Sequence, residues 1–327
     1  MGGADQPGVS LFIPTWNAGR EFPGILERML SQELDRPFEV VVIDSGSTDG
    51  TVELLERQPV RLERIPNSEF DHGLTRNRGV ELARGSLVVF ATQDARPADA
   101  HWMQRLVDCF EDPEVAGAFG RQLPRDDATP MVRYRLNAWV AGTEERVVQR
   151  VRDAAEFEAL TPLERLRVVA FDNVSSAVRK SVMVEHPFKR RKFGEDIDWA
   201  KRVILAGWKL VFEPRSLVVH SHNYSAWRTL KRIYGDHSNL HDLLGVHNIR
   251  TWDEVKRFTG EQTARYLAAV DADPTLTPFR RLVWRLKARP HAFAENLGQY
   301  LGPKAAGRIE GGSRLYRLLD RVMRKGV

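Results

Sequence analysis

The sequence is poor in cysteine, with Cys109 alone among 327 residues. One thiol supports neither an internal disulfide nor a cysteine-based zinc site, and this scarcity indicates a reducing compartment such as the cytoplasm. Long apolar runs are also missing: none approaches the ~20 residues that cross a bilayer, and residues 1–8 lack the basic and apolar regions of a secretory signal. Glycine (24) and proline (17) are too few for a fibrous or low-complexity chain.

The net charge of +5 is unevenly distributed along the chain. Residues 275–327 contain twelve Lys and Arg against three Asp and Glu, a local charge of +9. The preceding 274 residues contain 37 against 41, a charge of −4. Because a fold that binds nucleic acid throughout would not have an acidic body, nucleic acid is not an expected partner. The chain length corresponds to two domains, or to one large domain with an appendage.

Short apolar segments alternate with helical patterns over most of the chain. Strands are predicted over Val9–Ile13, Phe38–Ile43, Ser86–Ala91, Val115–Phe119 and Lys209–Val219. Helices are predicted over Arg20–Gln32, Thr51–Arg57, Gly73–Ala83 and His101–Phe110. Continuous apolar strands separated by helices are typical of βαβ units, in which helices flank a mostly parallel sheet. The sequence therefore predicts an α/β, Rossmann-like fold.

Helical patterns dominate the C-terminal part of the chain. Helices are predicted over Trp227–Leu244, Trp252–Val270, Pro278–Lys287 and Ser313–Lys325, separated by prolines 274, 278, 290 and 303. A proline usually ends a helix or occupies its first turn. We therefore predict an α/β domain over residues 1–225 and a basic helical region over residues 226–327.

Polar clusters follow three of the predicted strands, at the edge where open α/β sheets bind their ligands. They are Pro14-Thr15-Trp16-Asn17, the loop 44–51, and Thr92-Gln93-Asp94-Ala95. Each is by itself an ordinary turn or helix cap. If the clusters form a binding site, the Asp44 carboxylate could accept a hydrogen bond from the N3–H of a pyrimidine ring. Asp94 could bind Mg²⁺ or Mn²⁺, because both ions prefer oxygen ligands. The sequence has neither a Gly-x-Gly-x-x-Gly nor a Walker motif, which argues against a dinucleotide dehydrogenase and a P-loop NTPase.

Three further segments carry groups suited to phosphate, proton or metal chemistry. Arg76 and Arg78 open a predicted helix, where they and the helix N-terminus suit a diphosphate, although solvated arginines are as common there. Glu195-Asp196 opens another helix, and adjacent acids point in different directions, so one can face a cleft while the other caps. In His220-Ser221-His222 the two imidazoles share one face and can bind one ion, but an isolated pair is more often structural.

Together these segments resemble the family 2 glycosyltransferases of the GT-A fold. The matching stretches are Val9–Asn17, Val40–Thr51, Thr75-Arg76-Asn77-x-Gly79, Phe90–Pro97 and Glu195-Asp196 with Trp199, and they span residues 9–225. Within the family, Phe70–Asn77, Thr92–Ala95 and His220–Tyr224 look like the rhamnosyltransferase branch. The Asp-x-Asp motif of the family is here Thr92-Gln93-Asp94, so its first acid is missing.

This resemblance implies an inverting transfer of a sugar, with L-rhamnose from dTDP-L-rhamnose as the best match. The acceptor would be a glycan or lipid-linked glycan in the synthesis of a cell-surface polysaccharide such as O-antigen. Asp94 with His220 or His222 would bind Mg²⁺ or Mn²⁺ on the diphosphate. Asp196 would take the proton of the acceptor hydroxyl, and Glu195 would cap the helix or orient Asp196. The nucleotide would contact Pro14, Thr15, Asn17, Asp44, Ser45, Arg76, Gln93 and Asp94, and the sugar or acceptor pocket would include Asn173, Ser175 and Trp199.

Two basic regions remain to be explained. Lys189–Lys192 precedes the predicted catalytic helix and suits a mobile loop that closes near phosphates, or a solvated loop. Phe279–Lys287 and Leu315–Lys325 mix apolar and basic residues at helical spacing, as amphipathic helices on an anionic membrane do. A helical appendage or a dimer contact is the alternative. We therefore expect a cytoplasmic protein whose basic tail is a candidate for contact with the inner face of the cytoplasmic membrane.

Other functions remain open at this point. The same fold can use a UDP- or GDP-sugar, because the choice of donor depends on a few contacts. A non-catalytic protein that binds a sugar or nucleotide would fit the missing first acid, although Asp94 and Asp196 argue against it. A sugar nucleotidyltransferase would need a Gly-rich N-terminal loop with Arg and Lys, which this sequence lacks.

Overall fold

The computed structural model describes residues 7–138, 140–191 and 193–325. The chain divides into two compact units. Unit 1 comprises Met1–Arg125, Trp139–Ala159 and Arg167–His220, and unit 2 comprises Asp126–Ala138, Leu160–Leu166 and Ser221–Val327. Two segments of the sequence analysis lie partly outside the described residues. They are residues 1–8, which were compared with a secretory signal and of which 1–6 are not described, and the predicted basic loop, of which Lys192 is not described. The division into domains 1–225 and 226–327 stays a prediction, because a compact unit need not fold independently.

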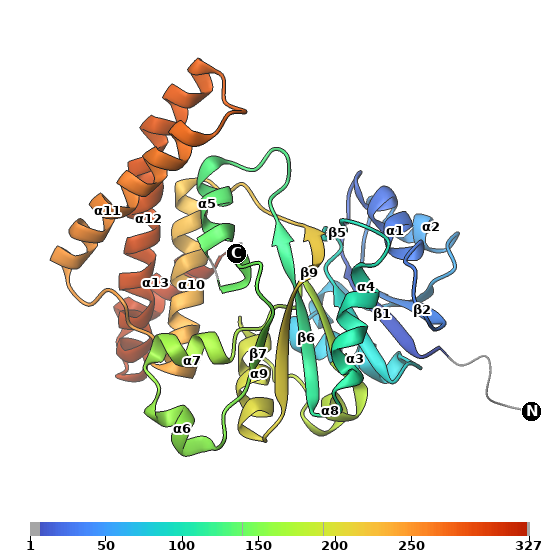
Figure 1. Cartoon of the computed structure of the whole chain (residues 1–327). Helices are drawn as coiled ribbons and strands as arrows, with labels where there is room; N and C mark the ends of the chain where they lie inside the picture. Colours follow the sequence, from blue (N-terminus) through green and yellow to red (C-terminus); the bar gives the residue numbers. More distant parts are fainter. Residues whose placement is uncertain (1–6, 139, 192, 326–327) are drawn as a thin grey trace, which may run out of the picture. The chain divides into compact units, whose positions relative to one another are not determined.

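Unit 1 is built on one mixed sheet (Figure 1) with the strand order β3-β2-β1-β4-β8-β6-β9-β5, to which β7 adds by pairing with β9. The strands are β1 Val9–Thr15, β2 Phe38–Asp44, β3 Arg61–Arg64, β4 Leu87–Ala91, β5 Arg96–Pro97, β6 Val115–Leu123, β7 Val147–Gln149, β8 Ser175–Arg179 and β9 Lys209–Val219. Strands β1, β2, β3 and β4 form three neighbouring pairs, β1–β2, β1–β4 and β2–β3, and each pair is parallel. Their carboxyl ends therefore lie at one edge, where the chain leaves into the three polar loops.

The predicted α/β class is confirmed, and the structure shows that the sheet is mixed. Strand β8 runs antiparallel to both β4 and β6. The sequence did not indicate this strand because two of its five residues are serines, which leave only a short apolar pattern. Strand β1 also continues beyond the predicted end through Pro14. Its pairing with β4 ends at Phe12, so the missing N–H of Pro14 interrupts no ladder on that side.

Helices pack on both faces of the parallel part of the sheet. The helices and helical turns that precede unit 2's long helices are α1 Phe22–Leu30, α2 Thr51–Leu55, η1 Asn67–Glu69, α3 His72–Leu82, α4 Trp102–Val107, η2 Asp108–Glu111, α5 Pro130–Ala138, η3 Val140–Gly142, α6 Ala154–Ala159, α7 Pro162–Val168, α8 Lys180–Glu185 and α9 Glu195–Leu205. Apolar side chains of α1 and α4 share a core with Leu11 and Ile13. On the opposite face α3 approaches β1 so closely that a Cβ at Gly79 would lie 2.3 Å from the Phe12 ring. The sheet is therefore covered on both faces, as its continuous apolar strands predicted.

Unit 2 is a bundle of long helices. They are α10 Ala226–Leu244, α11 Trp252–Ala272, α12 Pro278–Glu310 and α13 Arg314–Arg324, with α5 packed against α11. The prediction that a helix ends at Lys287 is wrong, because α12 continues through Pro290 and Pro303. Each internal proline costs a helix about 3 kcal/mol, and the extensive packing of α12 along α10 (Figure 1) offsets that cost. In the part of the chain that is described, no helix combines the length and apolar character needed to span a membrane.

The packing of α12 on α10 depends on two glycines of α12, Gly298 and Gly302. A substitution at Gly302 tests how much this close approach contributes to stability. A Cβ at Gly302 would lie 2.6 Å from the carbonyl oxygen of Tyr234 and 2.8 Å from the amide nitrogen of Ser238, both backbone atoms of α10. We expect Gly302→Ala to lower the free energy of unfolding by about 1–3 kcal/mol, because the two helices must separate. The change is measured by urea denaturation.

Gly307 in the same helix is the matched control, since a Cβ there meets no atom within 4 Å. Gly307→Ala should stabilise the protein by about 0.5–1 kcal/mol through helix propensity alone. Equal effects of the two substitutions would contradict the close approach of α12 to α10.

Candidate active site

The loop after β1 is held to the loops after β2 and β4 by its own backbone. Four consecutive amides donate hydrogen bonds to side chains of those loops: Trp16 to Gln93 Oε1 (2.8 Å), Asn17 to Ser47 Oγ (2.8 Å), Ala18 to Thr51 Oγ1 (3.0 Å) and Gly19 to Asp49 Oδ2 (3.0 Å). Gln93 also donates from Nε2 to the Trp16 carbonyl at 3.1 Å. Asn17 adopts a positive φ of 44°, which asparagine tolerates better than most residues. The three polar clusters therefore form one connected rim.

Asp44 is buried at the centre of this rim and is 1% exposed. Its Oδ2 accepts from Thr15 Oγ1 at 2.8 Å and from Ser47 Oγ at 2.6 Å. Its Oδ1 accepts from the amides of Gly46 and Ser47 at 3.0 and 2.9 Å. Ser45 donates to the Thr15 carbonyl at 3.0 Å. Both carboxylate oxygens thus organise the loop, and the predicted contact of Asp44 with a pyrimidine stays a prediction.

Asp94 and His220 form a potential cation-binding pair in unit 1. Asp94 lies in the loop after β4 and His220 directly after β9, and their Oδ2 and Nε2 atoms are 3.4 Å apart. The opposite ring nitrogen, Nδ1, lies 2.7 Å from Oε1 of Gln122 on β6. His222 follows two residues later in the chain, at the start of the segment assigned to unit 2. One carboxylate and one imidazole are suitable ligands for Mn²⁺ and, less strongly, for Mg²⁺.

Arg76 and Glu195 form a buried ion pair between α3 and α9. Their Nη1 and Oε1 atoms are 3.1 Å apart, and their side chains are 5% and 9% exposed. Gly73 permits this approach, because a Cβ there would lie 3.0 Å from the Lys189 carbonyl. Arg76 also donates to the His72 carbonyl, and its Nε finds no acceptor among the described residues. The structure thus gives Arg76 a role in placing α9 that the sequence did not predict.

The other groups near α3 and α9 are engaged by protein partners. Arg78 pairs with Glu63 on β3 instead of lying beside Arg76. In the predicted basic loop, Arg191 forms an ion pair with Asp198 of α9 at 2.8 Å, and Arg190 lies 3.6 Å from Asp71. These pairs attach the described part of the loop to the two helices.

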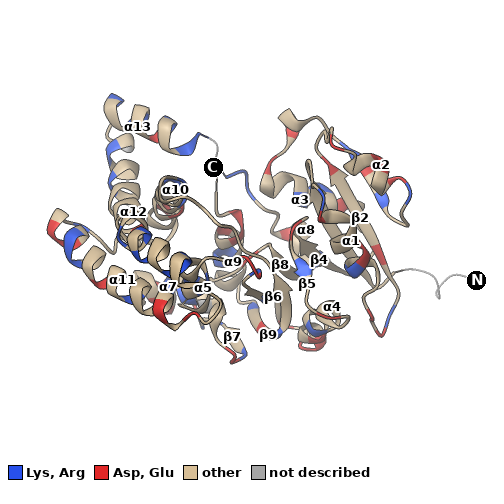
Figure 2. Ribbon diagram, turned by 90° about the horizontal axis from the view of Figure 1, so that it is seen from above, with Lys and Arg blue, Asp and Glu red and all other residues tan. Residues whose placement is uncertain are grey.

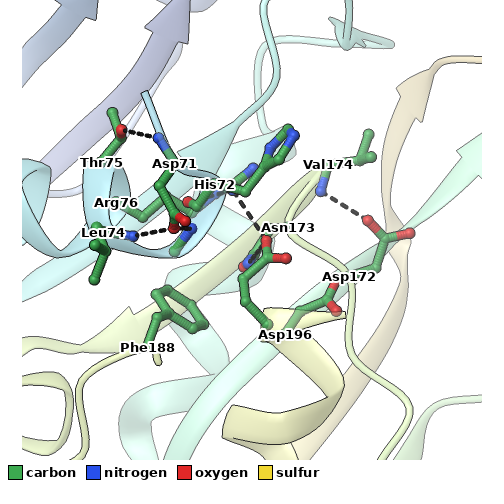
Figure 3. A network of polar contacts seen from close by, with 12 residues as sticks. Asp71, His72, Leu74, Thr75, Arg76, Asp172, Asn173, Val174, Phe188 and Asp196 are labelled. Atoms are coloured by element: carbon green, nitrogen blue, oxygen red, sulfur yellow. Dashed lines mark hydrogen bonds and ion pairs between the residues drawn. The ribbon is translucent and has the colours of Figure 1, made fainter. Parts of the chain in front are cut away.

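Asp196 stands beside Glu195 in the first turn of α9 and is half-buried. Burial and the nearby Glu195 and Asp172 carboxyls raise the pKa of Asp196 well above its usual range, and the charge of Arg76 opposes this shift. Figure 3 shows Asp172 and Asp196 approaching each other from separate segments, with Arg76 on α3 nearby. An aspartate with a raised pKa in a polar site is suited to general-base chemistry. Glu195 does not cap the helix, because Gly194 is the N-cap residue and Glu195 binds Arg76.

The residues predicted to line a sugar or acceptor pocket lie in the interior. Trp199 is fully buried and packs against Phe171 and Phe188. Ser175, 1% exposed, accepts a hydrogen bond from Trp102 Nε1 at 2.8 Å. Asn173, 3% exposed, donates weakly to Glu195 at 3.4 Å. In this structure these three residues are part of the buried interior and have almost no exposed surface that an acceptor could contact.

Sequence reasoning assigned no role of their own to Gln122 and Asp172. Gln122 donates through Nε2 to Asp172, and Asp172 Oδ1 accepts from the Val174 amide at 2.7 Å. The only sequence signal for Asp172 was a polar pair after an apolar run, and Gln122 stands in a strand with no motif. Their involvement emerges only from the pairing of β6 with β9.

Comparisons with known proteins define the class and the family of this chain. Its fold matches a mannosyltransferase from Pyrobaculum calidifontis, solved with GDP-Man and Mn²⁺, with a TM-score of 0.51 and 19% identity over 97% of this chain and 84% of that one. The fold is therefore the GT-A fold of glycosyltransferases. The family model described as glycosyl transferase family 2 matches residues 10–165.

Two relatives extend the similarity beyond that segment. The O-antigen chain rhamnosyltransferase RfbN of Salmonella typhimurium is 34% identical over 69% of this chain and 70% of its own length. The O-antigen chain rhamnosyltransferase WbaN of Salmonella anatum is 31% identical over 91% of this chain and 90% of its own. The chain belongs to glycosyltransferase family 2, and it is a glycosyltransferase, as the sequence motifs predicted.

The buried ion pair predicts a large and specific loss of stability. Arg76→Met removes the cation and leaves the Glu195 carboxylate buried without it, so we expect unfolding to become easier by about 3–5 kcal/mol. Urea denaturation of the whole protein, followed by tryptophan fluorescence, measures this change. Arg78→Met, which breaks the half-exposed pair with Glu63, is the control and should cost at most about 1 kcal/mol. Similar losses in the two variants would refute the structural role given to Arg76.

Proposed function

We propose that this glycosyltransferase transfers L-rhamnose from dTDP-L-rhamnose to a glycan or lipid-linked glycan during synthesis of a cell-surface polysaccharide, with inversion at the anomeric carbon. The observation that carries the proposal is the arrangement of Asp94, His220 and Asp196 in one unit, where Gln122 links His220 to Asp172 and the Asp172 carboxyl raises the pKa of Asp196. The names of the two Salmonella relatives support the choice of sugar and of acceptor class.

The rim formed by the three loops is the proposed nucleotide site. Thr15 and Asp44 would set the shape of the base pocket, with Pro14, Asn17 and Ser45 around them. Gln93, at the middle position of the Thr92-Gln93-Asp94 motif, braces the first loop through the Trp16 backbone. Asp94 then remains the only acid of that motif. The buried guanidinium of Arg76 would add positive potential toward the diphosphate from behind.

Asp94, His220 and His222 are the proposed ligands of Mg²⁺ or Mn²⁺, and each offers one ligand atom. The residues fit such an ion, because a carboxylate is combined with an imidazole whose second nitrogen already has a hydrogen-bond partner. When bound, the cation neutralises charge that develops on the departing diphosphate. The chain's own residues hold the cation's ligands in place and orient the donor.

Asp196 is the proposed general base. The oxygen of the acceptor hydroxyl attacks the anomeric carbon from the face opposite the nucleotide, and its proton moves to an Asp196 carboxylate oxygen. The bond between the anomeric carbon and the diphosphate oxygen breaks, and the diphosphate leaves with the electron pair. A raised pKa makes Asp196 a stronger base than an ordinary aspartate, and the ionised form is lost as the pH falls through that raised pKa. The rate should therefore fall on the acid side at a higher pH than an unperturbed aspartate would give.

A donor panel tests the proposal. The purified protein is incubated with dTDP-L-rhamnose, UDP-sugars and GDP-sugars, with Mg²⁺, with Mn²⁺ or with a chelator, and release of the nucleoside diphosphate is measured. We expect turnover of dTDP-L-rhamnose that the chelator abolishes. Asp196→Asn should reduce that turnover by about 10²–10⁴-fold, because the proton acceptor is lost.

Asp253→Asn, which changes an exposed acid of α11, is the control and should retain full activity. Turnover of a UDP- or GDP-sugar alone would replace the proposed donor. Full activity of Asp196→Asn would remove the base, and activity unaffected by the chelator would remove the metal. Nucleotide-sugar binding without turnover of any donor would favour a non-catalytic binding protein.

We also propose that the basic helices of unit 2 contact the anionic inner face of the cytoplasmic membrane. Leu315, Leu318 and Val322 of α13 are at least half exposed and follow helical spacing. Phe279, Leu282 and Leu286 repeat this spacing on α12 and are 75%, 56% and 71% exposed. Basic side chains accompany both stripes, as the blue segments of α12 and α13 show in Figure 2. Apolar stripes with basic flanks are typical of helices that lie in a membrane interface.

Sedimentation with lipid vesicles tests the membrane contact. The protein should bind phosphatidylcholine vesicles that contain phosphatidylglycerol, bind poorly to phosphatidylcholine alone, and dissociate at high salt. The double substitutions Leu315→Ser with Leu318→Ser, and Phe279→Ser with Leu286→Ser, should each weaken binding. Val184→Ser, at an exposed apolar residue of unit 1, should not. Equal binding by all variants would exclude these stripes as the contact.

A further inference from the structure

Gln122 connects the proposed cation site to Asp172 by its two chemically different ends. Its Oε1 lies 2.7 Å from His220 Nδ1, and its Nε2 donates to the carboxylate of Asp172. Asp172 is itself held by the amide of Val174 at 2.7 Å. All of these residues belong to unit 1. The chain of contacts therefore runs without a break from Asp94 through His220 and Gln122 to Asp172.

The backbone around His220 makes this arrangement rigid. Gln122 is paired with Val218 in the β6–β9 ladder, and the amide of His220 donates to the Leu123 carbonyl at 2.9 Å. The imidazole is only 11% exposed, so its ring has little room to turn. A ring held at both its backbone and its Nδ1 atom can present only Nε2 toward Asp94.

The chemistry of the partners decides which nitrogen carries the proton. An ionised carboxylate only accepts hydrogen bonds, so Asp172 takes the amide NH₂ of Gln122 and turns the amide oxygen toward His220. An amide oxygen also only accepts, and Gln122 Oε1 lies 2.7 Å from Nδ1 whereas the Asp94 carboxylate lies 3.4 Å from Nε2, so we expect the proton of a neutral His220 on Nδ1. The Nε2 lone pair then lies on the side of Asp94, which is the form of imidazole that binds a metal.

We propose that Gln122 and Asp172 are positioning residues that hold His220 in its Nδ1-protonated tautomer, with the Nε2 lone pair directed toward the cation site. This inference rests on the proposed metal-dependent function, and it assigns roles to two residues outside the recognised motifs. Asp172 also contributes to the raised pKa of Asp196, so one carboxylate acts on both the ligand side and the base side of the site.

The tautomer can be measured directly in the metal-free protein. Long-range ¹H–¹⁵N NMR of the His220 ring, recorded at a pH where the ring is neutral and Asp172 is ionised, should show the Nδ1–H form in the wild type. Gln122→Leu removes the acceptor at similar size and should shift His220 toward the Nε2–H form. In the Asp172→Asn variant the side-chain amide at this position can both donate and accept a hydrogen bond. Gln122 should then lose its fixed orientation, and both tautomers of His220 should be present.

The affinity for Mn²⁺, measured by calorimetry, should fall about 10–100-fold in both variants, as expected when the support of a ligating histidine is removed. Gln104→Leu is the matched control, because Gln104 of α4 donates to Asp108 of η2 and not to a residue of the proposed site. It should change neither the tautomer nor the affinity. If one site variant fails to fold, the other still tests the same arrangement.

The outcomes separate this inference from the proposed function. An Nε2–H tautomer in the wild type, or an unchanged tautomer in both folded variants, would overturn the positioning role whatever the enzyme binds. A tautomer that shifts while the Mn²⁺ affinity stays unchanged would also overturn it as a feature of the metal site. Mn²⁺ binding that survives His220→Ala would remove the metal ligand and hence the proposed function's metal site, independently of the NMR result.

Discussion

The buried ion pair between Arg76 and Glu195 is the interaction on which the rest of the site depends. It joins α3, which packs on the parallel strands, to the first residue of α9, and the next residue is Asp196. A buried pair of charges is costly to desolvate, so it persists only where the geometry is good and other polar groups assist. Here the His72 carbonyl and Asn173 provide that assistance. The start of α9 is thereby placed without any side-chain cap, and Asp196, the proposed base, is placed with it.

The loops at the carboxyl ends of β1, β2 and β4 are also held together by polar groups that form hydrogen bonds with one another. The backbone amides of residues 16–19 bind side chains of neighbouring loops, and Asp44 satisfies four donors. Buried polar groups without partners would be unstable, so such a rim forms as a whole or not at all. Preorganisation of this kind would let the proposed nucleotide site bind a charged donor without rearranging its loops.

The relation between sequence and structure differs between particular elements. Strands β1, β2 and β4 and helices α3 and α10 lie within a few residues of their predicted bounds, because continuous apolar runs and helical spacing are local signals. Strand β8 and the second half of α12 were missed for opposite reasons. Two serines weaken the pattern of β8, and two prolines conceal a helix that its packing against α10 maintains. Local propensity is a weak prior that burial overrides.

The sequence by itself determined the α/β class and the family, and it singled out the groups proposed to perform chemistry: Asp94, Asp196, His220 and His222. Motif order and residue type carry this information because strand ends and helix starts recur at fixed places in such a fold. Only the tertiary structure decided what supports those groups. Arg76 proved to hold Glu195, Trp199 to fill the core, and Gln122 to face His220. These contacts join residues up to 119 positions apart, and no local pattern encodes them.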